Sequence, residues 1–270
     1  MTELPLLIEP AELQPLLGDP NLLPVDLSKA SVHAQYRLPG ALFLDYGQLL
    51  AHRPPVSGLL PDTATLARLF GGLGIGTETW VVAYDDEGGG KAARLLWTLE
   101  LLGHQRFSLL NGGLFSWANE GYPLGDRPAT PRPTTFTPRF NPEILADANY
   151  IRAHLDNPRV ALLDARSGPE FRGEQRFSAR GGHIPGAKNL DWLEALDRGR
   201  NLRMRGADEL RPLLEGLGIT PDKEVITYCQ THHRSSFTYF MLKALGYPRV
   251  RGYPGSWSDW GNRADTPVEP

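Results

Sequence analysis

The chain has one cysteine, Cys229, and it lies in a polar segment, TYCQTHHRSSFTYF, at residues 227–240. An apolar run precedes the cysteine and a run with helical spacing follows it, so backbone N–H groups should converge on the sulfur at a helix N-terminus. Arg234 adds a permanent positive charge. These features lower a thiol pKa, and a fall from about 8.5 to about 6 would correspond to roughly 3.4 kcal/mol. We therefore predict a nucleophilic thiolate rather than an inert, buried cysteine.

The loop that follows the cysteine is predicted to stabilise the charged sulfur. Its residues are Gln230, Thr231, His232, His233, Arg234 and Ser235. The two adjacent histidines suggest a metal site, but adjacent side chains in a tight loop rarely face one ion, and no carboxylate in the loop completes the set. We predict that the chemistry needs no metal and no organic cofactor.

The elements around this loop are predicted from short apolar runs and helical spacing. Strands are expected at 160–164, 224–228 and 250–253, and helices at 207–217 and 235–245. Strands that alternate with helices indicate parallel βαβ units, with helices on both faces of the sheet. Ligands bind outside the carboxyl ends of such strands, which is where Cys229 is expected.

The chain is an internal duplication, as three pairs of segments show. They are PGA at 39–41 and 185–187, LFGGLGI at 69–75 and LLEGLGI at 213–219, and WVVAYD at 80–85 and EVITYC at 224–229. A period above one hundred residues indicates duplicated domains. Asp85 stands in the first copy where Cys229 stands in the second, so we expect the first copy to be catalytically inactive.

A proline-rich segment separates the copies. Its prolines stand at positions 123, 128, 131, 133, 138 and 142. Such a segment cannot form a helix and favours an extended linker. We therefore expect an N-terminal domain at 1–124, a linker at 125–143 and a catalytic C-terminal domain at 144–270.

Composition excludes several classes of protein. Lys and Arg total 28 against 31 Asp and Glu, a net charge of −3, which argues against a nucleic-acid partner. No apolar run is long enough to cross a membrane, and the N-terminal residues lack the pattern of a signal peptide. A cytoplasmic location is the expectation.

Four segments together resemble the tandem-domain rhodaneses, which are thiosulfate:cyanide sulfurtransferases. They are LLDAR at 162–166, GGHIPGAKNL at 181–190, CQTHHRSS at 229–236 and GSWSDWGN at 255–262. The cysteine loop reads CQTHHR, as in bacterial members. The resemblance extends over essentially the whole chain. It implies two similar α/β domains, of which only the second is catalytic, and a Cys229 that carries sulfur as a persulfide.

The resemblance also implies roles for residues outside the loop. Asp164, Arg166 and His183 belong to family motifs, for which we expect structural roles. Trp192 follows the HIPGA segment and is a candidate for the pocket wall. Glu170 is a second candidate, because it stands where mammalian-type enzymes have a substrate-binding arginine.

The implied partners are thiosulfate and cyanide or another thiophilic acceptor, which includes a protein sulfur acceptor. Three alternatives stay open. One is a 3-mercaptopyruvate sulfurtransferase, and another is a protein-to-protein sulfur carrier. The third is a phosphatase or arsenate reductase, whose related loop reads Cys-x5-Arg, whereas four residues separate Cys229 from Arg234 here.

Overall fold

The computed structural model describes residues 3–270, which pack into two compact units. The first unit comprises the chain up to Leu49, Pro61–Asn141 and Asp197–Met204, and the second comprises Leu50–Leu60, Pro142–Leu196 and Arg205–Pro270. Each unit contains one of the two sequence copies together with a short segment from the other copy. The predicted boundaries at 124 and 144 do not include this exchange.

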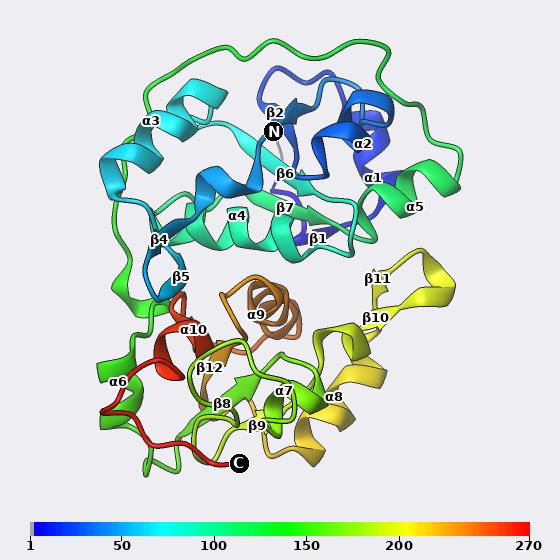
Figure 1. Cartoon of the computed structure of the whole chain (residues 1–270). Helices are drawn as coiled ribbons and strands as arrows, with labels where there is room; N and C mark the ends of the chain where they lie inside the picture. The colour runs from blue at the N-terminus through cyan, green and yellow to red at the C-terminus, as the bar shows by residue number, and fades with distance from the viewer. Residues whose placement is uncertain (1–2) are drawn as a thin grey trace. The chain divides into compact units, whose positions relative to one another are not determined.

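The first unit is built on a parallel sheet with strand order β1-β7-β6-β2-β3 (Figure 1). Its strands are β1 (Leu7–Ile8), β2 (Leu22–Asp26), β3 (Leu42–Phe43), β6 (Trp80–Tyr84) and β7 (Phe107–Leu110). Its helices are α1 (Pro10–Leu13), α2 (Ala30–Gln35), α3 (Thr63–Leu73), α4 (Gly90–Leu101) and α5 (Gly113–Asn119). The central strand β6 reads WVVAY, and all five of its residues are buried, as in a parallel strand covered on both faces.

The second unit repeats this design with strand order β13-β12-β8-β9, again parallel. Its strands are β8 (Val160–Asp164), β9 (Lys188–Asn189), β12 (Glu224–Tyr228) and β13 (Val250–Gly252). Its helices are α6 (Ala148–Ala153), α7 (Gly168–Phe171), α8 (Ala207–Gly216), α9 (Arg234–Ala244) and α10 (Ser256–Trp260). The predicted strands at 160–164 and 224–228 are confirmed, and the other predicted elements agree to within a residue at each end. The α/β fold with helices around parallel sheets is confirmed in both units.

Two short hairpins make the exchange between the sequence copies. The hairpin β4 (Ala51–Arg53) and β5 (Val56–Leu59) packs in the second unit, and β11 (Arg203–Met204), which pairs with β10 (Leu196–Asp197), packs in the first. In the first unit, the backbone N–H of Met204 donates to the Asn111 side chain at 2.8 Å, while Arg203 pairs with Glu9 at 2.8 Å. The two hairpins occupy equivalent places in the two copies.

The proline-rich segment is extended, but it packs along the first unit as far as Asn141. Phe136 is buried against Phe70, with ring centroids 5.2 Å apart. The backbone N–H groups of Thr134 and Arg139 donate to carbonyls of that unit at 2.9 and 2.7 Å. A buried aromatic side chain and backbone hydrogen bonds therefore hold a segment that composition alone describes as a linker.

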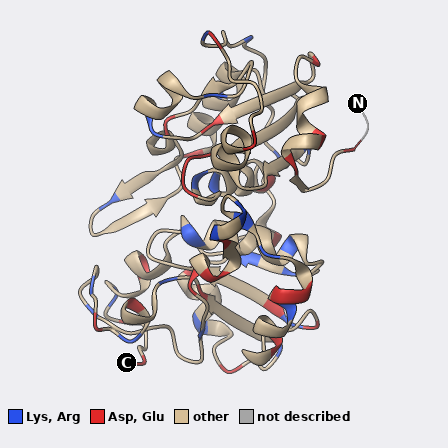
Figure 2. Ribbon diagram, turned by 90° about the vertical axis from the view of Figure 1, so that its right-hand side faces the viewer, with Lys and Arg blue, Asp and Glu red and all other residues tan. Residues whose placement is uncertain are grey.

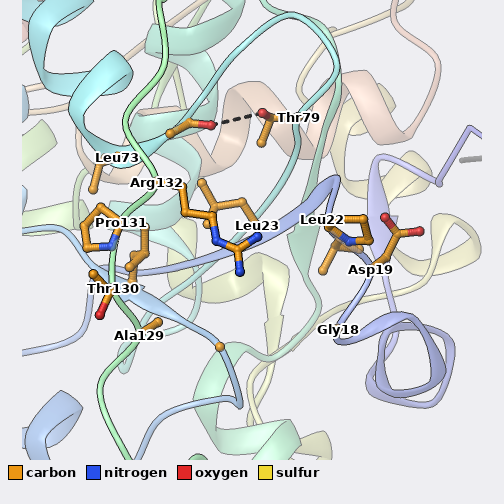
Figure 3. Close-up of a pocket in the computed structure, with 14 residues that line it drawn as sticks. Gly18, Asp19, Leu22, Leu23, Leu73, Thr79, Ala129, Thr130, Pro131 and Arg132 are labelled. Atoms are coloured by element: carbon orange, nitrogen blue, oxygen red, sulfur yellow. Dashed lines mark hydrogen bonds between the residues drawn. The ribbon is translucent and has the colours of Figure 1, made fainter.

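A hollow of about 480 Å³ lies at the amino end of the first sheet (Figure 3). Leu22 and Leu23 at the start of β2 line it, together with Thr79, which precedes β6, and with residues 129–132 of the extended segment. The Thr79 hydroxyl there donates to the Gly74 carbonyl at 3.1 Å. The hollow lies opposite the carboxyl edge where parallel sheets carry their chemistry.

Charged residues of both signs are interspersed along each unit (Figure 2). Within residues 3–270, no helix is long and apolar enough to cross a membrane. This mixture of charges agrees with the small net charge of the chain.

The loop after β6 holds a carboxylate, that of Asp85, at the position where the second copy has Cys229. Asp85 is fully buried, and its carboxylate accepts hydrogen bonds from the backbone N–H groups of Glu87, Gly89 and Ala92 at 3.0, 2.8 and 3.0 Å. Burial raises the pKa of this carboxyl despite those bonds. The side chain thus places its own anion among the N–H donors at the start of α4.

The Asp85 contacts predict a structural role. Replacing Asp85→Ala should lower the free energy of unfolding by roughly 1–3 kcal/mol, because three backbone N–H donors, two of them in buried bonds, lose their acceptor. Urea unfolding measures this loss. The matched control is Asp126→Ala, which removes an exposed ion pair to Arg127 at 3.5 Å and should cost less than about 1 kcal/mol. Equal stability of the two variants would contradict this role.

Candidate active site

Cys229 follows β12 directly and lies at the carboxyl edge of the second sheet, fully buried. The loop then turns through His232, whose φ of +55° lies in the left-handed region, and α9 begins at Arg234. Histidine enters this region more readily than branched residues do. The residue before the helix, His233, makes no side-chain capping bond. In the first turn of α9, the Ser235 N–H donates to the Cys229 sulfur, whereas the Ser236 N–H donates to the His233 carbonyl at 3.2 Å.

The surroundings of Cys229 favour the thiolate. Burial by itself would raise the pKa of the thiol, but the Arg234 charge, the Ser235 hydroxyl and the backbone N–H groups of Ser235 and Thr231 lower it to about 7. This agrees in direction with the fall predicted from the sequence. The positive charge and the hydrogen-bond donors outweigh desolvation because they lie close to the sulfur, and electrostatic interactions are stronger where water is excluded.

Helix α10 holds the start of the loop from the other side. The backbone N–H groups of Trp257 and Ser258 donate to the carbonyls of Cys229 and Gln230 at 2.9 and 3.0 Å. The Cys229 N–H donates in turn to the Ser256 hydroxyl at 3.2 Å. From the sequence, this segment served only for the family resemblance, and its serines were not singled out. Ser256 has a φ of +50°, which no sequence pattern in the segment signals.

Arg234 is held by a carboxylate. Its two terminal nitrogens donate to the two oxygens of Glu170 at 2.6 and 2.8 Å, and the Glu170 side chain is only 6% exposed. Ser167 also donates to this carboxylate, through its hydroxyl at 2.8 Å. Arg234 lowers the pKa of Glu170 against the effect of burial. Glu170 therefore lies against Arg234 rather than on an open wall of the pocket.

The remaining loop residues are anchored individually. His232 is buried, with Nδ1 2.7 Å from the Ser235 hydroxyl oxygen, so a hydroxyl that donates to sulfur can still accept from the imidazole. The Gln230 amide donates to the Ser178 hydroxyl at 3.1 Å. Ser178 lies between residues 166 and 183, where the second copy is about eight residues longer than the first, a stretch that we call the insertion. This insertion therefore helps to shape the loop.

Trp192, predicted as a candidate for the pocket wall, lies beside the loop. Its ring centroid is 5.9 Å from that of His233 and 5.8 Å from that of Phe237 on α9. The side chain is mostly buried, so it packs against the loop from the core side.

The motif residues Asp164, Arg166 and His183 lie beneath the loop. Arg166 and Asp164 form a buried ion pair at 2.6 Å, and the Arg166 guanidinium also donates to the Gly182 carbonyl at 2.8 Å. The His183 ring stacks on Phe171, with centroids 3.7 Å apart. These contacts join β8 to the HIPGA segment and support the structural roles expected for the three residues. Among residues 3–270, no three His, Cys, Asp or Glu side chains converge as a metal-binding group.

Comparison with known proteins identifies the family. The family model described as Rhodanese-like domain matches twice, over residues 9–120 and 147–263. The chain is 48% identical over 266 residues to the thiosulfate sulfurtransferase of Azotobacter vinelandii, covering 98% of this chain and 97% of that protein. It is 37% identical over 253 residues to the sulfur carrier protein TtuD of Thermus thermophilus, covering 86% and 84% of the two chains. The chain therefore belongs to the rhodanese family, with two rhodanese-like domains.

A solved structure shows the same fold. An anaerobic ergothioneine biosynthesis enzyme from Chlorobium limicola superposes with a TM-score of 0.82 at 24% identity. The match covers 92% of this chain but 64% of that one, so the present chain spans less than two thirds of the solved chain.

The lowered thiol pKa predicts how Cys229 reactivity depends on pH. The thiolate is the form above the pKa, so the rate of alkylation by iodoacetamide should rise with pH and reach half its maximum near pH 7. Because the chain has one cysteine, the reaction reports one site. The urea-unfolded chain is the control, with a midpoint near about 8.5. Coincident folded and unfolded midpoints would contradict the proposed stabilisation.

The Arg234–Glu170 pair predicts a second shift. Glu170→Gln removes a negative charge that partly cancels Arg234, so the Cys229 pKa should fall by about half a unit to one unit. Glu174→Gln is the control, since Glu174 pairs with Arg172 at 2.7 Å on the surface. Alkylation profiles of both variants test this. A rise in the Cys229 pKa of the Glu170→Gln variant would contradict this prediction, because it would show that Glu170 acts mainly by holding the guanidinium in place.

Proposed function

We propose that this protein is a thiosulfate sulfurtransferase that carries sulfur as a persulfide on Cys229, with CQTHHR as its active-site loop. The observation that carries the proposal is a buried thiol at the carboxyl edge of β12, with a pKa lowered to about 7 by an arginine, a hydroxyl and two backbone N–H groups. The thiosulfate sulfurtransferase of Azotobacter vinelandii, 48% identical over nearly the whole chain, supports the choice of donor.

In the first step the Cys229 thiolate attacks the outer sulfur of thiosulfate. A bond forms between the two sulfurs as the bond from the outer sulfur to the sulfonate breaks, and sulfite leaves with the electron pair. The product is a persulfide anion. The Thr231 and Ser235 N–H groups that stabilise the thiolate face this anion too, so the site stabilises both charged forms of the enzyme.

In the second step a thiophilic acceptor removes the outer sulfur. Cyanide attacks it, thiocyanate leaves, and the electron pair of the sulfur–sulfur bond returns to Cys229 as thiolate. The cycle balances without an external oxidant, because the outer sulfur of thiosulfate is already at the oxidation level of the sulfur that the persulfide carries. Two half-reactions through a covalent intermediate predict ping-pong kinetics.

Arg234 contributes mainly as a fixed charge near the sulfur. Its terminal nitrogens are engaged by Glu170, so the planar fork that could bind two phosphate oxygens is already occupied. This arrangement disfavours the phosphatase and arsenate reductase alternatives.

A protein acceptor is the second candidate for the last step. The 37% identity to the sulfur carrier protein TtuD favours it, and the same Cys229 persulfide would serve both acceptors. A 3-mercaptopyruvate donor would load the same sulfur. Donor and acceptor can therefore be exchanged in an assay without any change in the predicted intermediate.

The persulfide predicts a defined change in mass. Thiosulfate should add one sulfur atom to the intact chain, and cyanide should remove it with release of thiocyanate. Cys229→Ser should gain no sulfur and lose more than about a thousandfold in kcat. Intact-mass spectrometry and a thiocyanate assay measure the two effects, and 3-mercaptopyruvate in place of thiosulfate tests the donor. Sulfur bound to Cys229→Ser would contradict the assignment.

A further inference from the structure

The hairpin β4–β5 comes from the first sequence copy, yet it packs in the second unit against the cysteine loop. Gly58 on β5 is buried, with a φ of +76°. A methyl group added to its Cα would lie 2.5 Å from the Thr231 carbonyl oxygen and 2.6 Å from the Thr231 Cβ. Real side chains do not approach so closely, so only glycine lets the hairpin backbone rest on Thr231.

The same hairpin reaches the loop by a second route. The backbone N–H of Ser57 donates to the Ser258 hydroxyl at 2.8 Å, and the Ser258 N–H donates to the Gln230 carbonyl at 3.0 Å. The Ser57 hydroxyl lies 2.8 Å from His52 Nδ1 across the hairpin. Ser57 is thereby held at both its backbone and its side chain.

The two routes end on Thr231 and on the peptide before it: the Ser258 N–H binds the Gln230 carbonyl, while Gly58 lies against the Cβ and the carbonyl of Thr231. The Gln230 carbonyl and the Thr231 N–H belong to the same planar unit, so their directions are fixed together. Ser258 holds the carbonyl end, and Gly58 packs on the residue at the N–H end. That N–H is one of the donors to the Cys229 sulfur. A small rotation of this peptide would turn the donor away from the sulfur.

We propose that Gly58 is a positioning residue for sulfur transfer: the hairpin 50–60 sets the direction of the Gln230–Thr231 peptide and so aims the Thr231 N–H at the reacting sulfur. The residue touches neither substrate nor sulfur and acts through Thr231. The proposal rests on the proposed function, since it assigns a support to the same persulfide site. On this proposal a segment of the first copy supports the chemistry of the second copy indirectly, through Thr231.

The test compares two glycine variants of the full chain. Gly58→Ala should raise the Cys229 pKa by about half a unit to one unit and lower kcat/KM for thiosulfate roughly tenfold to a hundredfold. The matched control is Gly246→Ala, since Gly246 also has a positive φ, of +82°, but an added methyl would meet nothing within 4 Å. Both variants should lose some thermal stability, while only Gly58→Ala should shift the alkylation profile.

The readout separates this proposal from the function itself. Alkylation by iodoacetamide needs no sulfur donor, so the pKa of Cys229 is measured even if thiosulfate fails to load the wild-type chain. A folded Gly58→Ala with the wild-type alkylation profile overturns the proposal, whatever its turnover. If Gly58→Ala does not fold, Ser258→Ala decides, because it removes the acceptor for the Ser57 N–H. A raised Cys229 pKa in Ser258→Ala supports the proposal, and an unchanged pKa overturns it.

Discussion

A negatively charged sulfur that is buried away from water needs hydrogen-bond donors in contact with it, because burial otherwise favours the protonated thiol. The second unit is organised around this requirement. Burial alone would keep Cys229 protonated, and the reversal to a pKa of about 7 comes from Arg234, Ser235 and two backbone N–H groups. Those donors depend in turn on the left-handed turn at His232 and the uncapped start of α9. Helix α10, the insertion and the β4–β5 hairpin then fix the loop that presents them.

The first unit meets the same requirement with a different anion. Its loop also ends a buried central strand and precedes a helix, and its N–H groups also converge on one negative group. That group is the carboxylate of Asp85, which accepts three of the N–H bonds by itself. Both copies therefore direct backbone N–H groups at one anion. In the first copy this anion is a carboxylate that is part of the chain, and in the second it is, on our proposal, a sulfur that gains and loses a second sulfur atom. The Asp85 carboxylate contributes to the stability of the fold, whereas Cys229 satisfies its N–H donors in the same way only while its sulfur is negatively charged.

The sequence predicts local structure well where local patterns determine it. The apolar runs VALLD and EVITY locate β8 and β12, because a parallel strand buried on both faces needs continuous apolar residues. The position of Cys229 follows from the end of β12. The partner of Arg234 could not be predicted, because Glu170 is 64 residues away and no pattern marks an ion pair between different elements. The role that we propose for Gly58 could not be predicted from the sequence either, since a glycine in a short hairpin normally indicates a turn. Only the approach of another backbone shows why glycine is needed there.

The reciprocal hairpins have a consequence for how the duplicated chain can be divided. The segment Leu50–Leu60 packs in the second unit although its neighbours on both sides pack in the first, and Asp197–Met204 does the converse. A cut at the boundary between the sequence copies would therefore yield two fragments that each lack a hairpin and carry an unpartnered one. Such fragments are suited to complement each other rather than to act as independent modules. Gene duplication has produced two folds of one kind here, but the exchanged segments have removed the modularity that duplication normally leaves behind.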